Sequence, residues 1–243
     1  MLYIEADSLM QADSIFNILI DAGDDNFGTL FYSGRIAMIN NNYSRAAERF
    51  NEALLYVDSI PEIWLDLGAA YRFQDSIEVA LTVFDSGLTY MVSPGDSTTL
   101  MFGKAVTLER NGQFEEASGI FEKIIELSPD NDQALNYLGY MLAEEGVRLE
   151  YARGLIRRAL DIEPENGAYL DSYGWVLHKL GDYREALEYL LRAYELMPDD
   201  PVIVEHIGYV YEALGDMAKA NEFWKAALDL DPENESLKEK LEQ

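Results

Sequence analysis

The chain contains no cysteine among its 243 residues, and basic residues are scarce, with 18 lysines and arginines against 45 acidic residues. The absence of cysteine excludes disulfides, thiolate nucleophiles and cysteine-ligated zinc. The formal net charge of -27 argues against nucleic acid as a partner, because phosphate backbones require a basic footprint. The same charge disfavours anionic membrane surfaces. A basic or neutral partner, or a metal ion, is electrostatically easier to bind.

Long apolar runs are also missing from the chain. No stretch approaches the ~18 consecutive apolar residues that span a bilayer, and residues 1–7 lack the basic region that opens a signal peptide. Hydrophobic residues nevertheless make up 49% of the sequence, which is ample for a continuous core. We therefore expect a soluble, folded chain without membrane insertion, and its compartment stays open between cytoplasm and periplasm.

A pattern of small and aromatic residues recurs about every 34 residues along the chain. Its clearest instance is Trp64-x2-Leu67-Gly68-x2-Tyr71, followed by Ala80-x3-Phe84. Residues 34 apart occupy equivalent places in three pairs, Gly174 and Gly208, Ala186 and Ala220, and Pro198 and Pro232. A fixed period of this size is typical of a stacked repeat array and not of a globular enzyme domain.

The spacing within each period predicts two helices joined by short turns. Apolar residues fall on one helical stripe, and Gly or Ala where two helices cross lets their axes approach closely. Glycine marks the turn between the helices at Asn111-Gly112, Gly181-Asp182 and Gly215-Asp216, where it supplies a left-handed helix stop. Proline follows the second helix at Pro129, Pro164, Pro198 and Pro232, where no helix can continue.

These residues resemble the tetratricopeptide repeat family over nearly the whole chain, with the best match in the last three repeats. The resemblance implies an all-α fold, an α-solenoid of antiparallel helix pairs in a right-handed superhelix whose first helices line a concave groove. We expect about six full repeats, an N-terminal half repeat and a C-terminal capping helix. The expected segments are 1–26 (partial repeat), 27–60, 61–97, 98–131, 132–166, 167–200, 201–234 and 235–243 (capping helix).

The first segment departs from the family pattern. Phe16 follows Ala12 by four residues, which fits a second helix whose own first helix is missing. We therefore expect the chain to be a fragment of a longer protein. The regular Gly-Asp turns and Pro-Glu-Asn junctions are similar to those of bacterial members of the family.

Groove positions of the first helices carry the candidate binding residues. They are Tyr137, Tyr140, Glu144, Asp171, Trp175, His178, Glu205, His206, Tyr209 and Glu212. Tyr140, Trp175 and Tyr209 share one position in three consecutive repeats, which predicts a ladder of aromatic anchors. The alternative is that these rings pack on neighbouring first helices as core. The acidic side chains suggest a ligand with Lys or Arg, whereas a solvated face would explain the same charge without a ligand.

Catalytic and metal motifs are missing, because the sequence has no GxGxxG, P-loop, GxSxG or HExxH pattern. His178 and His206 are the only histidines and lack a tight ligand spacing. We therefore expect no enzyme activity, no cofactor and no metal. The leading prediction is a scaffold that binds a protein or peptide segment in its groove. The alternatives are an interaction module of a larger enzyme or cell-envelope assembly protein, and an array that self-associates through its N-terminal half repeat.

Overall fold

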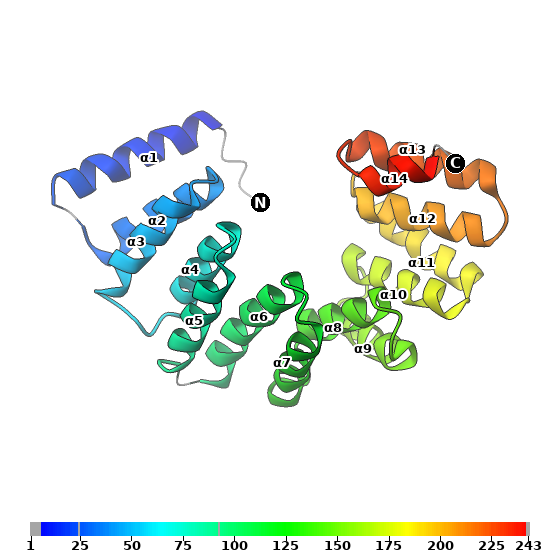
Figure 1. Cartoon of the computed structure of the whole chain (residues 1–243), viewed down its shortest axis with the longest axis horizontal. Helices are drawn as coiled ribbons and strands as arrows, with labels where there is room; N and C mark the ends of the chain where they lie inside the picture. The colour runs from blue at the N-terminus through cyan, green and yellow to red at the C-terminus, as the bar shows by residue number, and fades with distance from the viewer. Residues whose placement is uncertain (1–5, 24, 92, 242–243) are drawn as a thin grey trace. The chain divides into compact units, whose positions relative to one another are not determined.

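The computed structural model describes residues 6–23, 25–91 and 93–241, and every regular element in these ranges is an α-helix (Figure 1). The helices are α1 (Ala6–Asp21), α2 (Phe27–Ile39), α3 (Tyr43–Leu54), α4 (Pro61–Phe73), α5 (Ile77–Leu88), α6 (Pro94–Arg110), α7 (Phe114–Leu127), α8 (Asp132–Glu144), α9 (Leu149–Ile162), α10 (Gly167–Leu180), α11 (Tyr183–Leu196), α12 (Pro201–Ala213), α13 (Met217–Leu230) and α14 (Glu235–Leu241). The predicted all-α solenoid of helix pairs is confirmed. In this described part, no helix is both long enough and apolar enough to cross a bilayer.

The ends of the helices follow from local sequence. Side-chain oxygens accept hydrogen bonds from backbone N–H groups of the first helical turn at Asn26, Asn42, Asn131, Asn166, Asp200 and Asp216. Proline stands in the first turn of α4, α6 and α12, where its missing N–H costs nothing. Gly181 ends α10 with a φ of 89°, a left-handed conformation that glycine adopts without strain.

The chain divides into two compact units, with the boundary between Ser128 and Pro129. In the first unit α1 packs on α2, and the pairs α2–α3, α4–α5 and α6–α7 follow in order. In the second unit the pairs are α8–α9, α10–α11 and α12–α13, and α14 packs on α13 (Figure 1). Helices pair with their neighbours in sequence because each short turn returns the chain along the helix just completed. The exact repeat boundaries stay a prediction.

The helices of a pair cross where the repeat pattern places glycine. A Cβ atom built on Gly68 would lie 2.4 Å from Cζ of Phe84, and one built on Gly208 would lie 2.3 Å from Cδ1 of Trp224. These rings therefore occupy the space that a side chain would take. Trp224 is 1% exposed, and Trp64 is also buried. The interpretation of both tryptophans as core residues is confirmed.

Helix α10 is the most enclosed helix of the second unit, because it packs against α8, α9, α11 and α12. Ten of its 14 residues are buried, including the polar side chains Asp171 and Ser172. Burial on this scale requires that polar groups on α10 find partners within the protein. It explains why the candidate site is organised around this helix.

Helix α1 packs mainly on α2, and Arg45 of α3 also forms an ion pair with Asp13 of α1. Its Ile15 and Ile18 side chains are 56% and 66% exposed. Such apolar exposure is compatible with the predicted self-association, which remains a prediction. Residues 1–5 of the predicted partial repeat and 242–243 of the predicted capping helix lie outside the described residues.

Candidate partner-binding surface

The ten candidate residues lie on the first helices of three consecutive pairs in the second unit. Tyr137, Tyr140 and Glu144 belong to α8, Asp171, Trp175 and His178 to α10, and Glu205, His206, Tyr209 and Glu212 to α12. Helix α10 contacts both α8 and α12, so the three helices adjoin in this order (Figure 1). We call these ten residues the first-helix surface.

Trp175 is the centre of this surface, and it is buried, with 7% of its area exposed. Its ring stacks on His206 with a centroid separation of 4.0 Å and on His178 with one of 4.8 Å. Its indole N–H donates a hydrogen bond to the Glu144 carboxylate. Trp175 therefore holds His178, His206 and Glu144 in place, and it has little exposed area for direct contact with a ligand.

Asp171 and His206, the two buried polar residues of the first-helix surface, form a side-chain hydrogen bond. Nδ1 of His206 lies 2.8 Å from Oδ1 of Asp171, and both side chains are less than a tenth exposed. A buried carboxylate requires such a partner, since transfer from water without one is costly. The contact also fixes the orientation of the imidazole that stacks on Trp175. Asp171 and His206 thus serve to position the surface.

The predicted aromatic ladder is interrupted by a histidine. Trp175 and Tyr209 are in ring contact at 5.9 Å, whereas the Tyr140 ring lies 6.4 Å from His206. His206 therefore packs against both the α8 and α10 aromatics. Trp175 fits the alternative interpretation, in which the ring packs on neighbouring first helices as part of the core. Tyr140 and Tyr209 are half-buried and keep part of their rings accessible.

Carboxylates surround the two half-buried phenols. Burial raises the pKa of Tyr140 above its ordinary value, and the negative charges of Glu144, Asp171 and Glu205 raise it further. Burial, together with Glu205, raises the pKa of Tyr209 to about 12. Both hydroxyls therefore stay protonated at neutral pH. The surface combines neutral hydrogen-bond donors with a negative potential, which suits a cationic ligand.

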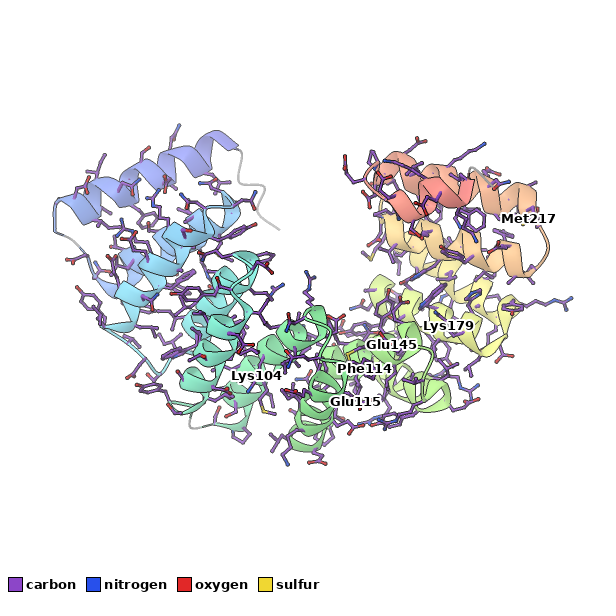
Figure 2. The ribbon with its side chains drawn as sticks, viewed as in Figure 1. Lys104, Phe114, Glu115, Glu145, Lys179 and Met217 are labelled. Atoms are coloured by element: carbon purple, nitrogen blue, oxygen red, sulfur yellow. The ribbon has the colours of Figure 1, made fainter. Side chains whose placement is uncertain are left out.

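The protein's own lysines occupy parts of this surface. Nζ of Lys179, a residue labelled in Figure 2, lies 4.8 Å from the Trp175 ring centroid and 3.4 Å from the carbonyl oxygen of Glu144. An ammonium group over an aromatic face is attracted by the ring quadrupole. One aromatic residue and one oxygen of the first-helix surface therefore already bind a cation.

A second internal lysine reaches the surface from α14. Nζ of Lys240 lies 4.9 Å from the Tyr209 ring centroid and 4.5 Å from that of Trp224. It is also 3.0 Å from the Glu212 carboxylate. Sequence reasoning missed Lys240, because nothing in the spacing of a terminal helix relates it to a residue 28 positions earlier. Two rings and a carboxylate together form a site for an ammonium group.

In the ranges that the structure describes, no three His, Asp or Glu side chains converge as metal ligands would. The two histidines are instead stacked on Trp175, and one of them is held by Asp171. Their contacts are those of packing and orientation.

His178 is expected to stay neutral well below the usual pH of histidine protonation. Burial, the nearby His206 and Lys179 lower the pKa of His178 from 6.5 to about 4. As pH falls, His178 is protonated in the unfolded chain before it is protonated in the folded chain, and this favours unfolding. The contribution of the neutral His178 to the free energy of unfolding is therefore complete above pH 6.5 and is lost as pH falls toward 4. Between pH 6.5 and pH 4, the free energy of unfolding measured by chemical denaturation should therefore fall more steeply with decreasing pH for the unsubstituted chain than for His178→Gln.

NMR titration of the two imidazoles provides an independent check of that prediction. The His178 resonance should move with a midpoint near pH 4. A midpoint near 6.5 would contradict the enclosed environment that the structure gives this side chain.

Comparison with protein families covers most of the chain. One model described as tetratricopeptide repeat matches residues 33–89 and 102–167, which together are just over half of the sequence. The chain belongs to the tetratricopeptide repeat family. Two further tetratricopeptide repeat models match residues 167–200 and 204–234. Membership makes the chain a protein–protein interaction module, and no enzyme family is indicated.

Two similar proteins match this chain at low sequence identity. The general transcriptional corepressor trfA of Dictyostelium discoideum is 27% identical over 89 residues, which are 37% of this chain and 6% of the corepressor. The Cut9–Hcn1 hetero-tetramer structure of APC/C matches with a TM-score of 0.78 and 16% identity, over 98% of this chain and 46% of that one. This chain therefore spans less than half of either protein.

Two shorter structures match nearly over their full length. A thermophilic tetratricopeptide repeat protein of Thermus thermophilus has a TM-score of 0.62 and 22% identity, over 75% of this chain and 97% of its own. MamA of Desulfovibrio magneticus has a TM-score of 0.58 and 15% identity, over 72% and 97%. At such identities the likeness establishes the fold alone. Bacterial origin and the status of a fragment stay predictions.

Proposed function

We propose that the first-helix surface binds an extended, basic segment of a partner protein. The observation that carries this proposal is the position of Lys240, whose ammonium group lies between two aromatic rings and the Glu212 carboxylate. A surface that attracts the protein's own ammonium groups has the chemistry to attract those of a partner.

The charge of the surface supports the same class of ligand. The ten residues include four carboxylates and no lysine or arginine. Asp171 is engaged with His206, and Glu212 is paired with Lys240. Glu144 is exposed and Glu205 is half-buried, and each accepts a hydrogen bond from a neutral N–H group. Acidic ligands would be repelled here, and basic ones would approach faster because of the overall negative charge. Selectivity thus follows from the local carboxylates.

The aromatic residues that remain accessible are tyrosines. Tyr137, Tyr140 and Tyr209 are half-buried on α8 and α12, whereas Trp175 is enclosed between them. Half-buried tyrosines offer large contact area and a hydroxyl group at low cost in side-chain entropy. In this proposal they pack against the backbone and apolar atoms of the bound segment.

Direct binding to matched peptides tests the proposal. Three fluorescent peptides would share one sequence and carry arginine, glutamine or glutamate at the same positions, with affinity measured by anisotropy at physiological ionic strength. The arginine peptide should bind, and the other two should bind at least about tenfold more weakly, as expected for loss of charge-assisted contacts. Equal affinity for the arginine and glutamine peptides would overturn the proposal.

A charge-matched pair of variants separates the surface from the general negative field. Glu144→Gln with Glu205→Gln should weaken arginine-peptide binding about five- to tenfold, since two partly screened ion pairs are lost. Glutamine keeps an acceptor for the Trp175 N–H and for Nδ2 of Asn234, so the fold is preserved. The control changes two exposed carboxylates of α11, Glu188→Gln with Glu195→Gln, and should alter affinity less than about twofold. An equal loss of affinity in the two double variants would mean that the peptide does not bind specifically at the first-helix surface.

A further inference from the structure

A pocket between α8, α10 and α12 adjoins the first-helix surface. Its polar lining consists of Asn136, Tyr137, Tyr140, Asp171, Ser172 and Asp200. Val202 and Ile203 of α12 form an apolar wall, and Ala168 of α10 completes the lining. We infer that this pocket receives one basic side chain of the bound segment. The inference rests on the function proposed above and identifies where its specificity lies.

The size of the pocket fits a single side chain. Its volume is about 240 Å³, whereas pockets for drug-sized ligands and cofactors usually occupy ~300–1,000 Å³. Tyr137, Tyr140 and Asp171 line the pocket and also belong to the first-helix surface. A segment bound along that surface can therefore insert one side chain here without leaving it.

One polar atom of the pocket lacks a hydrogen-bond donor in the part of the chain that the structure describes. Oδ1 of Asn136 is buried and has no hydrogen-bond partner among the described residues. A buried acceptor left without a donor costs about 1–3 kcal/mol, so a hydrogen bond from an N–H group that reaches this oxygen would be favourable. As an amide oxygen, it can accept a hydrogen bond but cannot donate one.

The charged groups select a cation. Asp171 and Asp200 line the pocket, and no lysine or arginine does so. In the described part of the chain neither carboxylate forms an ion pair with lysine or arginine: Asp171 contacts His206, and Asp200 caps the backbone of α12. An acidic side chain would be repelled, and a neutral one would gain no charge-assisted hydrogen bond from these carboxylates.

The apolar wall accommodates the alkyl part of the same side chain. Val202 is 45% exposed, and Ile203, which also lines the pocket, is 2% exposed. Lysine and arginine carry aliphatic stems that pack on apolar surface while the charged head reaches polar groups. The lining therefore matches both parts of one basic residue, with the stem on α12 and the head toward Asn136 and Asp171.

N-acetyl-arginine amide and N-acetyl-citrulline amide test the inference, because citrulline is the neutral isostere of arginine. The probes would be titrated into the full chain and followed by backbone amide shifts in two-dimensional NMR. Arginine amide should cause saturable shifts at Asn136, Ser172 and Val202, and citrulline amide should bind about tenfold or more weakly. Equal shifts with both probes, or arginine shifts elsewhere only, would overturn the inference.

A variant that fills the pocket completes the test. Ala168 is exposed and lines the pocket, so Ala168→Arg adds an internal guanidinium there and should abolish the shifts caused by arginine amide. Ala226→Arg adds the same charge at an exposed position of α13 outside the pocket and should leave them unchanged. Unchanged binding in Ala168→Arg would contradict the assignment.

The two proposals fail in different ways. If arginine peptides bind the chain but arginine amide does not enter the pocket, the pocket inference is wrong and the proposed function stands. If arginine amide enters the pocket but arginine and glutamine peptides bind equally, the proposed function is wrong. Thermal unfolding of both arginine variants verifies that the fold is intact in each comparison.

Discussion

Replacing Trp175 with alanine should lower the free energy of unfolding by about 3–5 kcal/mol, as measured by urea denaturation. The ring is 7% exposed and stacks on both histidines, so its removal leaves a cavity at the centre of the second unit. The Glu144 carboxylate also loses the indole N–H that it accepts. The loss should exceed that of a single replacement of Glu144, Glu205 or Glu212, which are at least partly exposed.

Trp175→Phe is the matched control for that prediction. Phenylalanine keeps an aromatic ring against His206 but cannot donate to Glu144, so it should cost clearly less than alanine. A loss below about 1 kcal/mol for Trp175→Ala would be inconsistent with a packed ring. This variant is consequently a poor probe of ligand contact, because reduced binding would follow from the damaged fold. Variants of Glu144 and Glu205 probe the surface more directly.

Replacing Gly208 with alanine should destabilise the chain by about 1–3 kcal/mol, even though alanine has the higher helix propensity by about 1 kcal/mol. The added Cβ would lie 2.3 Å from both Cδ1 and Nε1 of Trp224. Trp224 is 1% exposed and is packed in the core cluster of α12, α13 and α14, so the ring cannot move aside freely. Overpacking therefore outweighs the gain in propensity.

Gly154→Ala in α9 is the control with the opposite sign. It lies inside a helix of the same unit, and a Cβ atom there meets nothing within 4 Å. Alanine at this position should raise the free energy of unfolding by up to ~1 kcal/mol through backbone entropy and propensity. Urea denaturation of both variants gives the comparison. A stabilised Gly208→Ala variant would show that the helix crossing is looser than the structure indicates.

Local features of the chain were predictable because they depend on residues close in sequence. The Gly181 stop at the end of α10 and the proline starts of α4 and α12 follow from backbone chemistry that each residue carries in any context. The contact between Gly208 and Trp224 was also foreseeable, since a residue pattern repeated every 34 positions implies the same helix crossing each time.

The candidate site was predictable only in part. The sequence indicated which residues share first helices, and it placed Tyr140, Trp175 and Tyr209 at equivalent positions. It could not indicate that Trp175 is enclosed while the two tyrosines are half-exposed, because equivalent positions differ in how many neighbours cover them. Helix α10 has helices packed around it, and that environment is a property of the unit as a whole.

The sequence by itself determined the all-α repeat fold, the turns and the helix crossings, because these arise from periodicity and from the conformational limits of glycine and proline. Only the tertiary structure decided the pairing of Asp171 with His206, the position of Lys240 against Tyr209, and the pocket at Asn136. Each of these joins side chains from different helix pairs. Their distances depend on the packing angle between pairs, for which the signature residues allow a range of values.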